Sequence, residues 1–474
     1  MVGVNPVFSF ANGGNTMQTP KEEMKRSLGL GSALSIVVGT IIGSGIFFKQ
    51  GSVLDSAGNS TMAILAWVVG GILTLTAGLT IAEIGAQMPY TGGLYVYIED
   101  LYGRLWGFLA GWMQVIVYGP AIIASVAGFM SILMTNFFGL GANWRIPLAL
   151  ITILAIGLMN MFENRVGAAF SVITTIGKLV PIAAIIIFGL FWGHHNALGQ
   201  TVGEIHAASG NFGVAVLATL FGYDGWILIA NLGGEIKHPQ KILPQAIIIG
   251  ITAVLVIYTL ITVAVLRFLP ASQIHTLGEN TTAYLAMAAF GPIGGKLLSA
   301  GIIISMMGTI NGKMLTFPRI VYAMAKRRDL PFSRYLAYLT PKAKAPVVAT
   351  VFIIVLATVM MIFFNPDRLS DLCVFTVYCF YTLAFFGIFI LRKRNDASAR
   401  PFSTPLYPWI PILAIVGGLF VLVSEVINDP AGVLLFIGVV IVGLPVLYLV
   451  KKLDQRRVAK AMNIEHPLDD DQDQ

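Results

Sequence analysis

The chain has 474 residues, of which 56% are apolar and only 11% are charged, and its formal net charge is +7. Soluble domains usually carry about 25% charged residues, so this composition excludes a soluble enzyme, a disordered chain and a disulfide-rich scaffold. The loop charges of a membrane protein account for the positive balance, so nucleic acid is not an expected partner. The composition indicates an all-α polytopic membrane protein embedded in a lipid bilayer.

Apolar runs separated by charged or Pro-, Gly- and Asn-rich breaks recur along the whole chain. Apolar residues are numerous enough for roughly a dozen spans of ~20 residues each. The run VAVLATLF around 214–221 is apolar on every side, which favours helices over the alternating strands of a β-barrel. The twelve predicted membrane helices lie near 32–48, 61–86, 104–135, 146–162, 168–192, 212–234, 243–269, 292–324, 346–364, 369–391, 408–426 and 432–450.

Lys and Arg residues are distributed unequally between the two sides of this arrangement. If the N-terminus is inside, 23 of the 30 lie in inner segments and five in outer ones. Cytoplasmic loops of membrane proteins carry such an excess of positive charge. We therefore predict a multi-pass protein of the cell membrane with both termini cytoplasmic and with tails over 1–27 and 452–474.

The first span contains the interruption GTIIGSGIF at 39–47. Two glycines flank a serine at mid-membrane, and each glycine disfavours a helix by about 1 kcal/mol relative to alanine. Unwound backbone inside a membrane must face a cavity or protein. The N–H groups at the start of the following half-helix then suit a carboxylate. Close helix packing through small residues is the alternative explanation.

The sixth span contains a similar interruption, FGYDGW at 221–226. Interrupted helices at corresponding positions of two repeats indicate a transporter site at the membrane midplane. Such a site suits a substrate with both charges: N–H groups of the first span face its carboxylate, and freed carbonyls of both spans face its ammonium. Gly222 and Gly225 permit close approach of the backbone, and Phe221 and Trp226 are candidates to close over the substrate.

Four segments of the chain form a characteristic series. They are GTIIGSGIF, TGGLYVYIEDLYG at 91–103, FGYDGW with the following GGEIKHPQKILPQAI at 233–247, and NGKMLTFPRIVYAMAKRRDLP at 311–331. Taken in this order, they resemble the amino acid–polyamine–organocation superfamily. Within it they resemble the L-type amino acid transporter family, and most of all its bacterial serine/threonine exchangers. The similarity runs from about residue 25 to 450.

This resemblance implies a LeuT-like fold and alternating access. A 5+5 inverted repeat would place five helices in 28–192 and five in 212–395, followed by two more in 405–451. The resemblance also implies sodium-independent exchange of amino acids. Animal members bind a heavy chain through a cysteine between spans 3 and 4, but the corresponding loop, roughly 136–145, has none. A disulfide-linked heavy chain is therefore not expected.

The resemblance further implies that the interruption of the first span binds the carboxylate and amine of the substrate. The first aromatic residue of the second interruption, Phe221, matches a gate residue of the family. Asp224 has several possible roles: it can accept a hydrogen bond from a substrate hydroxyl, attract a cationic side chain or cap a freed helix end; we favour a capping or network role. The predicted substrate-binding residues are Ile41, Gly43, Ser44, Gly45, Ile46, Phe221, Tyr223, Asp224 and Gly225.

Lys178 lies in the middle of the fifth span, where an ionisable group costs about 2.5–3.5 kcal/mol on insertion scales. Sodium-coupled relatives of the fold place a cation between spans 1 and 8, close to span 5. By this resemblance the ammonium replaces sodium, contacts carbonyls at the first interruption and side chains of span 8, and couples substrate occupancy to inward closure. Snorkelling is the alternative. With Phe221, Trp226 and Asn311, Lys178 makes up the predicted gating and coupling set.

The sequence lacks the motifs of the main alternatives to a transporter. It has no nucleophile–base set, metal-ligand spacing or P-loop, so we expect neither an enzyme nor a bound metal or other cofactor. Glu83, near the inner end of the second span, is predicted to be a structural partner of a basic group. The sequence thus predicts a sodium-independent exchanger of neutral amino acids, with serine and threonine favoured. Proton-coupled symport is the alternative, and a channel or receptor is a more distant one.

Overall fold

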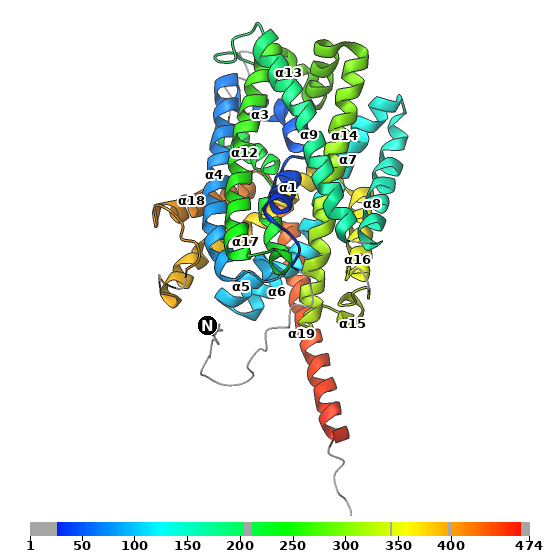
Figure 1. Cartoon of the computed structure of the whole chain (residues 1–474), viewed down its shortest axis with the longest axis vertical. Coiled ribbons are helices and arrows are strands. Elements are labelled where there is room, and N and C mark those ends of the chain that lie inside the picture. The colour runs from blue at the N-terminus through cyan, green and yellow to red at the C-terminus, as the bar shows by residue number, and fades with distance from the viewer. Residues whose placement is uncertain are drawn as a thin grey trace, which may run out of the picture.

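The computed structural model describes residues 26–162, 164–202, 211–341, 344–396, 398 and 400–465. These residues form a helical bundle in which most helices run along the long axis of the molecule (Figure 1). Within the described ranges, eleven helical segments are long and apolar enough to cross a membrane. The protein is therefore a multi-pass membrane protein, as predicted. Of the two predicted tails, residues 1–25 and 466–474 lie outside the described part of the chain.

The helices follow the order of the predicted spans. The helix at the ninth predicted position, α16, has 17 residues and is shorter than the eleven segments. The helices of the membrane-crossing segments, with α16, are α1 (Leu30–Ile41), α2 (Gly45–Phe48), α4 (Ser60–Gln87), α6 (Arg104–Met113), η1 (Gln114–Tyr118), α7 (Gly119–Phe138), η2 (Ala142–Trp144), α8 (Arg145–Phe162), α9 (Asn164–Trp192), α11 (Phe212–Gly222), η3 (Trp226–Asn231), α12 (Pro239–Phe268), α14 (Thr281–Lys326), α16 (Val347–Phe363), α17 (Pro366–Arg394), α18 (Trp409–Asn428) and α19 (Pro430–Glu465).

Short helices cover the two ends of the bundle. At the end where the described chain begins lie α5 (Leu94–Tyr102), η4 (Gly233–Glu235) and α15 (Ser333–Leu336). At the opposite end lie α3 (Gln50–Ala57), α13 (Ala271–Leu277) and η5 (Gly278–Asn280). Figure 1 shows the first end at the bottom and the second at the top. We call them the inner and the outer end, following the predicted orientation.

Both predicted helix interruptions are present. Helix α1 ends at Ile41, and α2 begins at Gly45 after three residues without helical structure. Helix α11 ends at Gly222, and the chain continues as the 3-10 helix η3 from Trp226. Gly225 in the intervening turn has a φ angle of 109°, in a region that only glycine adopts readily. The glycines thus end the helices where the sequence predicted.

The two interruptions touch each other. A Cβ atom on Gly45 would lie 2.4 Å from the Cα atom of Gly222, so the backbones meet where neither residue has a side chain. Thr40 Oγ1 in α1 lies 3.1 Å from the carbonyl oxygen of Gly225. The hydroxyl of Tyr258 in α12 lies 3.2 Å from a carbonyl oxygen at the end of α1 and 3.0 Å from one at the end of α11. Two segments about 180 residues apart in the sequence are therefore held together at the centre of the bundle.

The third span contains a π-helical turn, η1, between α6 and α7. Pro120 lacks an N–H group and cannot donate to the carbonyl four residues earlier. The N–H of Gly119 instead donates to the carbonyl of Gln114, five residues earlier. Such turns are frequent at functional sites. Here the turn ends at Tyr118, whose side chain reaches the central site described below.

Two long helices differ from their predicted extents. In α14, Gly291 has a φ angle of 69°, and this kink divides the 46-residue helix just before the predicted start of the eighth span. Helix α19 runs to Glu465, about 15 residues past the predicted end of the last span. Figure 1 shows this final part projecting from the inner end.

The contacts of Glu83 confirm the prediction that it is the structural partner of a basic group. Its carboxylate is completely buried. Arg392 of α17 donates to both carboxylate oxygens at 2.7 and 2.6 Å, and the backbone N–H of Thr404 donates to one of them at 2.7 Å. A buried carboxylate needs such partners because an unpaired charge is strongly destabilising there. Glu83 thus ties the inner end of α4 to α17.

Candidate functional site

A small cavity lies where the two interruptions meet. We call it the central cavity. Helices α7 and α14 complete its walls, so that spans 1, 3, 6 and 8 all contribute. The lining residues are Thr40, Ile41, Gly43, Ser44, Gly45, Ile122, Val126, Phe221, Asp224, Thr309 and Lys313.

The structure places six of the nine predicted substrate-binding residues at this cavity. The other three are buried but do not line it. Tyr223 points toward α4, where its hydroxyl donates to the carbonyl of Trp67 at 2.9 Å. Gly225 contacts the backbone of Thr40 instead. The six cavity residues are Ile41, Gly43, Ser44, Gly45, Phe221 and Asp224.

Ser44 supplies a polar group that the protein itself leaves unused. Its hydroxyl is buried and has no hydrogen-bond partner among the described residues. A buried hydroxyl without a partner costs about 1–3 kcal/mol. A bound molecule that offers a hydrogen bond at the first interruption would therefore recover this energy.

Lys178 occupies the position that the family resemblance implied. Its side chain is completely buried. The Nζ atom lies 2.9 Å from the carbonyl oxygen of Gly39, 2.5 Å from that of Ile42 and 3.4 Å from Thr309 Oγ1 of α14. Carbonyl groups in the last turn of a helix lack intrahelical partners and carry the negative end of the helix dipole. The ammonium group thus satisfies the broken end of α1 and links it to spans 5 and 8.

Asp224 lies in a buried network of three side chains. It accepts a hydrogen bond from the Tyr118 hydroxyl at 2.6 Å and forms an ion pair with Lys313 at 3.2 Å. The side chains of Asp224 and Lys313 are 7% and 2% exposed, so each charge is compensated mainly by the other. This geometry agrees with the network role that we favoured for Asp224.

Two predicted gating residues lie away from the lining of the central cavity. The Trp226 ring packs on Tyr381 of α17, with centroids 5.3 Å apart. The side-chain oxygen of Asn311 accepts a hydrogen bond from Asn160 at 2.8 Å and thereby joins α14 to α8. The other two members of the set, Phe221 and Lys178, line the cavity or contact its first interruption.

Sequence reasoning missed several residues of the site. Their backbone positions were not predictable because helix pairing decides which face of α7 and α14 meets the interruptions. Pro120 was the available signal for Tyr118, since a proline inside a span marks a local distortion of the helix. The missed cavity residues are Thr40, Ile122, Val126 and Thr309. From the sequence, Lys313 in the inner half of span 8 was a candidate for the cytoplasmic gate, not for the substrate site.

A seam closes the bundle at the inner end of the site. The backbone N–H groups of Ser27 and Leu28 donate to the carbonyl of Glu235 at 2.8 and 2.9 Å. The carboxylate of Glu235 forms a buried ion pair with Arg319 of α14. The segment before α1, the segment after η3 and the inner part of α14 are therefore joined at one residue.

Helix α5 covers the same end through a second polar cluster. The Tyr95 hydroxyl donates to Asp329 at 2.6 Å, and Arg104 donates to the same carboxylate at 2.7 Å. Glu99 forms an ion pair with Arg327. Burial raises the pKa of Glu99, and the Arg327 guanidinium offsets this effect only in part.

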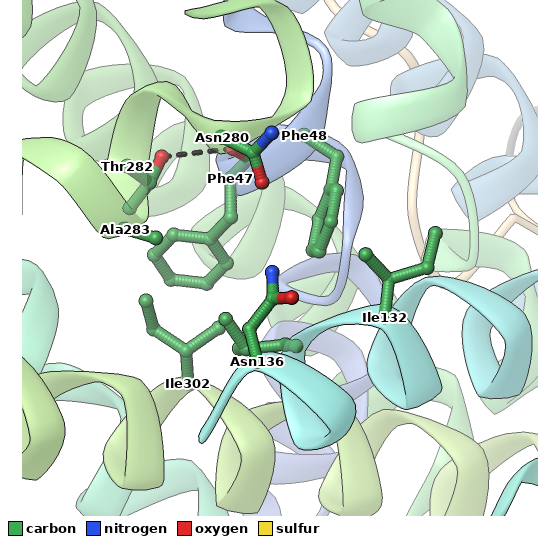
Figure 2. A pocket seen from close by; sticks show the side chains of 9 residues that line it. Phe47, Phe48, Ile132, Asn136, Asn280, Thr282, Ala283 and Ile302 are labelled. Atoms are coloured by element: carbon green, nitrogen blue, oxygen red, sulfur yellow. Dashed lines mark hydrogen bonds between the residues drawn. The ribbon is translucent and has the colours of Figure 1, made fainter. Parts of the chain in front are cut away.

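A second small cavity lies toward the outer end. Figure 2 shows its lining, with Phe47 and Phe48 of α2 on one side and Ile132 and Asn136 of α7 on the other. We call it the outer hollow. Among the described residues, no group of three or more His, Cys, Asp or Glu side chains is placed to hold a metal ion, here or elsewhere.

Comparison with known proteins identifies the family. The family model for amino acid permeases matches residues 28–447. The chain belongs to this family. The family resemblance that the four sequence segments indicated is therefore confirmed.

Several individual relatives of this permease cover most of its length. It is 49% identical to the serine/threonine exchanger SteT of Bacillus subtilis (strain 168) over 439 residues, which are 92% of this chain and 99% of that protein. It is 30% identical to the large neutral amino acids transporter small subunit 2 of Homo sapiens over 439 residues, 90% and 80% of the two chains. It is 28% identical to the Asc-type amino acid transporter 1 of Mus musculus over 446 residues, 90% and 81% of the two chains.

Proposed function

We propose that this permease exchanges neutral amino acids, serine and threonine above all, across the cell membrane without sodium. The central cavity at the two touching interruptions is the observation that supports this most, because it offers unwound backbone and the unpartnered Ser44 hydroxyl to a small polar ligand. The similarity to a serine/threonine exchanger supports the same substrate class.

The proposed architecture is a LeuT-like bundle of twelve spans. The eleven long segments and the shorter α16 together supply this number. The repeats occupy 28–192 and 212–395, and the last two helices occupy 405–451. Both termini are cytoplasmic, since the excess of Lys and Arg lies on that side.

In the proposed complex, the substrate lies between the interruptions as a zwitterion. Its carboxylate faces the backbone N–H groups of 43–45 at the start of α2, and its ammonium faces freed carbonyls of both interrupted spans. The Ser44 hydroxyl hydrogen-bonds to the carboxylate. Phe221 lies over the bound molecule as a gate. Ile46, Tyr223 and Gly225 shape the interruptions without touching the substrate.

The ion pair of Asp224 and Lys313 beside the cavity determines which substrate charges are accepted. Lys313 already neutralises Asp224. A cationic side chain would have to displace the lysine ammonium from its carboxylate, and an anionic one would meet that carboxylate. Neutral side chains avoid both costs, and a hydroxylated one can hydrogen-bond to this polar wall.

Lys178 is proposed to take the place of a sodium ion. Its ammonium binds the carbonyls at the broken end of α1 and the hydroxyl of span 8. A tethered charge is present in every step of the cycle, so no ion has to be bound from solution. Movement of α1 when substrate leaves is then coupled to spans 5 and 8.

The permease is proposed to work without a disulfide-linked heavy chain. Between α7 and α8, residues 139–144 contain no cysteine. Both cysteines of the sequence, Cys373 and Cys379, lie in α17 instead.

Counterflow in proteoliposomes tests the function. Vesicles loaded with unlabelled serine should take up labelled serine or threonine equally well in sodium and in choline buffer, and empty vesicles should not. Uptake by empty vesicles under a pH gradient would instead establish proton-coupled symport. Loss of uptake in choline buffer would contradict sodium independence.

A further inference from the structure

The last membrane helix, α19, is held by few contacts with the rest of the protein. In its most apolar stretch 11% of the residues are buried, against 33% or more in each of the other ten membrane-crossing segments. Trp112 of α6 makes one of these contacts, because its Nε1 donates to the carbonyl of Val439 at 3.1 Å. A Cβ atom on Gly443 would lie 2.8 Å from the same ring. Most of the surface of α19 therefore faces outward, away from the bundle.

Helices α6 and α19 bring two aromatic residues to the same depth near the inner end. The two helices run in opposite directions, because α6 begins at the inner end and the final part of α19 projects from it (Figure 1). Trp106 precedes Trp112 by about 9 Å along its helix, and Tyr448 follows Gly443 by about 7.5 Å. Both aromatic side chains are exposed. They therefore lie on neighbouring helices at the inner edge of the membrane-crossing region, where aromatic residues favour the lipid headgroups.

The sequence of α19 changes from apolar to cationic at this depth. Residues 430–450 contain no Lys or Arg, whereas 451–460 contain five, with one Asp. Lys451 and Lys452 are exposed, and the Nζ atom of Lys452 lies 5.9 Å from the ring centroid of Tyr448. Within the described part of the chain neither lysine forms an ion pair, whereas Arg104 at the start of α6 is paired with Asp329. The two lysines are therefore available to an anion from outside the protein.

An exposed apolar stripe leads along α19 to these lysines. Ile441, Leu444 and Tyr448 are all exposed. Their spacing of three and four residues continues to Lys451 and Lys452, so all five lie along one face of the helix. The stripe suits acyl chains, and the two ammonium groups suit a phosphate. We call the surface formed by Trp106, Tyr448, Lys451 and Lys452 the inner corner.

We propose that the inner corner binds an anionic phospholipid of the inner leaflet. The lipid phosphate lies at the ammonium groups of Lys451 and Lys452, and the acyl chains follow the stripe toward Ile441. Clusters of Lys and Arg directly after a membrane helix attract anionic lipids in this way. The bound lipid covers a helix that the protein itself holds by few contacts. This proposal rests on the proposed orientation of the chain and not on amino acid exchange.

Lipid binding by the purified, full-length permease in a neutral detergent tests the inner corner. Phosphatidylglycerol and phosphatidylcholine with identical acyl chains are added in equal amounts, so that only the headgroup differs. Native mass spectrometry then measures how much of each lipid the protein retains. We expect the parent protein to retain several-fold more phosphatidylglycerol than phosphatidylcholine.

The double variant Lys451→Gln with Lys452→Gln should lower this ratio several-fold, because the phosphate loses both ammonium groups. Lys451→Arg with Lys452→Arg should keep the ratio of the parent, since the charges remain. The matched control is Arg145→Gln with Lys296→Gln, which removes two exposed cations nearer the outer end and should leave the ratio unchanged.

Equal retention of the two lipids by the parent would overturn the proposal, because the surface would then contact lipid without selecting its charge. An unchanged ratio in the Lys451→Gln, Lys452→Gln variant would overturn it too, as would an equal fall in the control, which would reflect net charge alone. Size-exclusion chromatography identifies any variant that fails to fold. If the double variant misfolds, Lys452→Gln alone decides.

Discussion

Asp224 and Lys313 place two opposite charges beside a cavity proposed for a zwitterion. Their ion pair is buried on both sides, and Tyr118 donates to the same carboxylate. Removing one partner of a buried pair is strongly destabilising, whereas replacing both is often tolerated. A double-mutant cycle on this pair can therefore measure both the free energy of unfolding and the selectivity for substrate charge.

Lys313→Met is expected to leave Asp224 as an unpaired carboxylate in the cavity wall. Cationic amino acids should then compete better with labelled serine in counterflow, because their side chain can replace the lost ammonium. The free energy of unfolding should fall by about 3–5 kcal/mol. The double variant Asp224→Asn with Lys313→Met should regain the preference for neutral substrates. Unchanged competition by lysine in the single variant would contradict this account.

Lys178→Ala should reduce exchange by about tenfold or more, because the carbonyls at the broken end of α1 lose a charged donor worth about 1.5–3 kcal/mol. Initial counterflow rates at saturating serine measure the effect, and a symmetric size-exclusion peak shows that the variant folds. Leu179→Ala is a matched control at the next position, where the side chain is 40% exposed. Unchanged exchange in Lys178→Ala would reject the coupling role.

The sequence predicted individual site residues unequally. Ser44 and its glycine neighbours were predictable because the GSG segment itself ends the helix. Tyr223 was not, since consecutive residues of a turn point in different directions and the sequence does not specify the torsion angles that decide this. The Lys178 partners were implied by family resemblance, whereas the ion pair of Asp224 with Lys313 depends on how span 8 is rotated.

At the scale of the helices, the two interruptions depend on glycine at their point of contact. Gly45 and Gly222 approach so closely that a methyl group on Gly45 would overlap the backbone of α11. Backbone atoms cannot move aside as a flexible side chain can. The glycines therefore do more than end the helices, since they also allow the two broken ends to meet.

Gly45→Ala is thus expected to force the interruptions apart, to abolish measurable counterflow and to lower the free energy of unfolding by about 1–3 kcal/mol. Gly438→Ala in α19 is the matched control, because an added Cβ there meets nothing within 4 Å. It should leave exchange unchanged. Normal exchange by Gly45→Ala would show that the close contact is dispensable.

The helices themselves were largely predictable from apolar runs and from their glycine interruptions. The π-helical turn η1 was missed, although Pro120 is its physical cause. The 3-10 form of η3 was missed too. The extension of α19 to Glu465 was missed because an apolar pattern shows which residues lie in the membrane, and not where a helix ends in water.

At the scale of the whole molecule, both ends of the central site are closed together. The Glu235 seam joins spans 1, 6 and 8 at the inner end, and Lys49 with Asp367 joins span 1 to α17 at the outer end. In the proposed exchange cycle, these contacts would have to open in turn. Their partners are far apart in the sequence, so packing of the complete bundle was needed to find them.

Glu235→Gln should weaken the inner closure, since Arg319 would lose its buried carboxylate. In a variant that lacks both native cysteines, labelling of Val126→Cys by an impermeant thiol reagent from the inner side should rise several-fold, and labelling from the outer side should not. Asp100→Asn, which removes an exposed pair with Arg394, is the control and should have no effect because such pairs contribute about 0–1 kcal/mol. A rise from the outer side alone would contradict this assignment.

An experimental structure determined with L-serine or L-threonine bound tests the central claim most directly. We predict the ligand between the two interruptions, with its carboxylate at the backbone N–H groups of 43–45 and its ammonium at freed carbonyls of both spans. Ligand bound elsewhere in the bundle, or a continuous helix through either interruption in the complex, would contradict it.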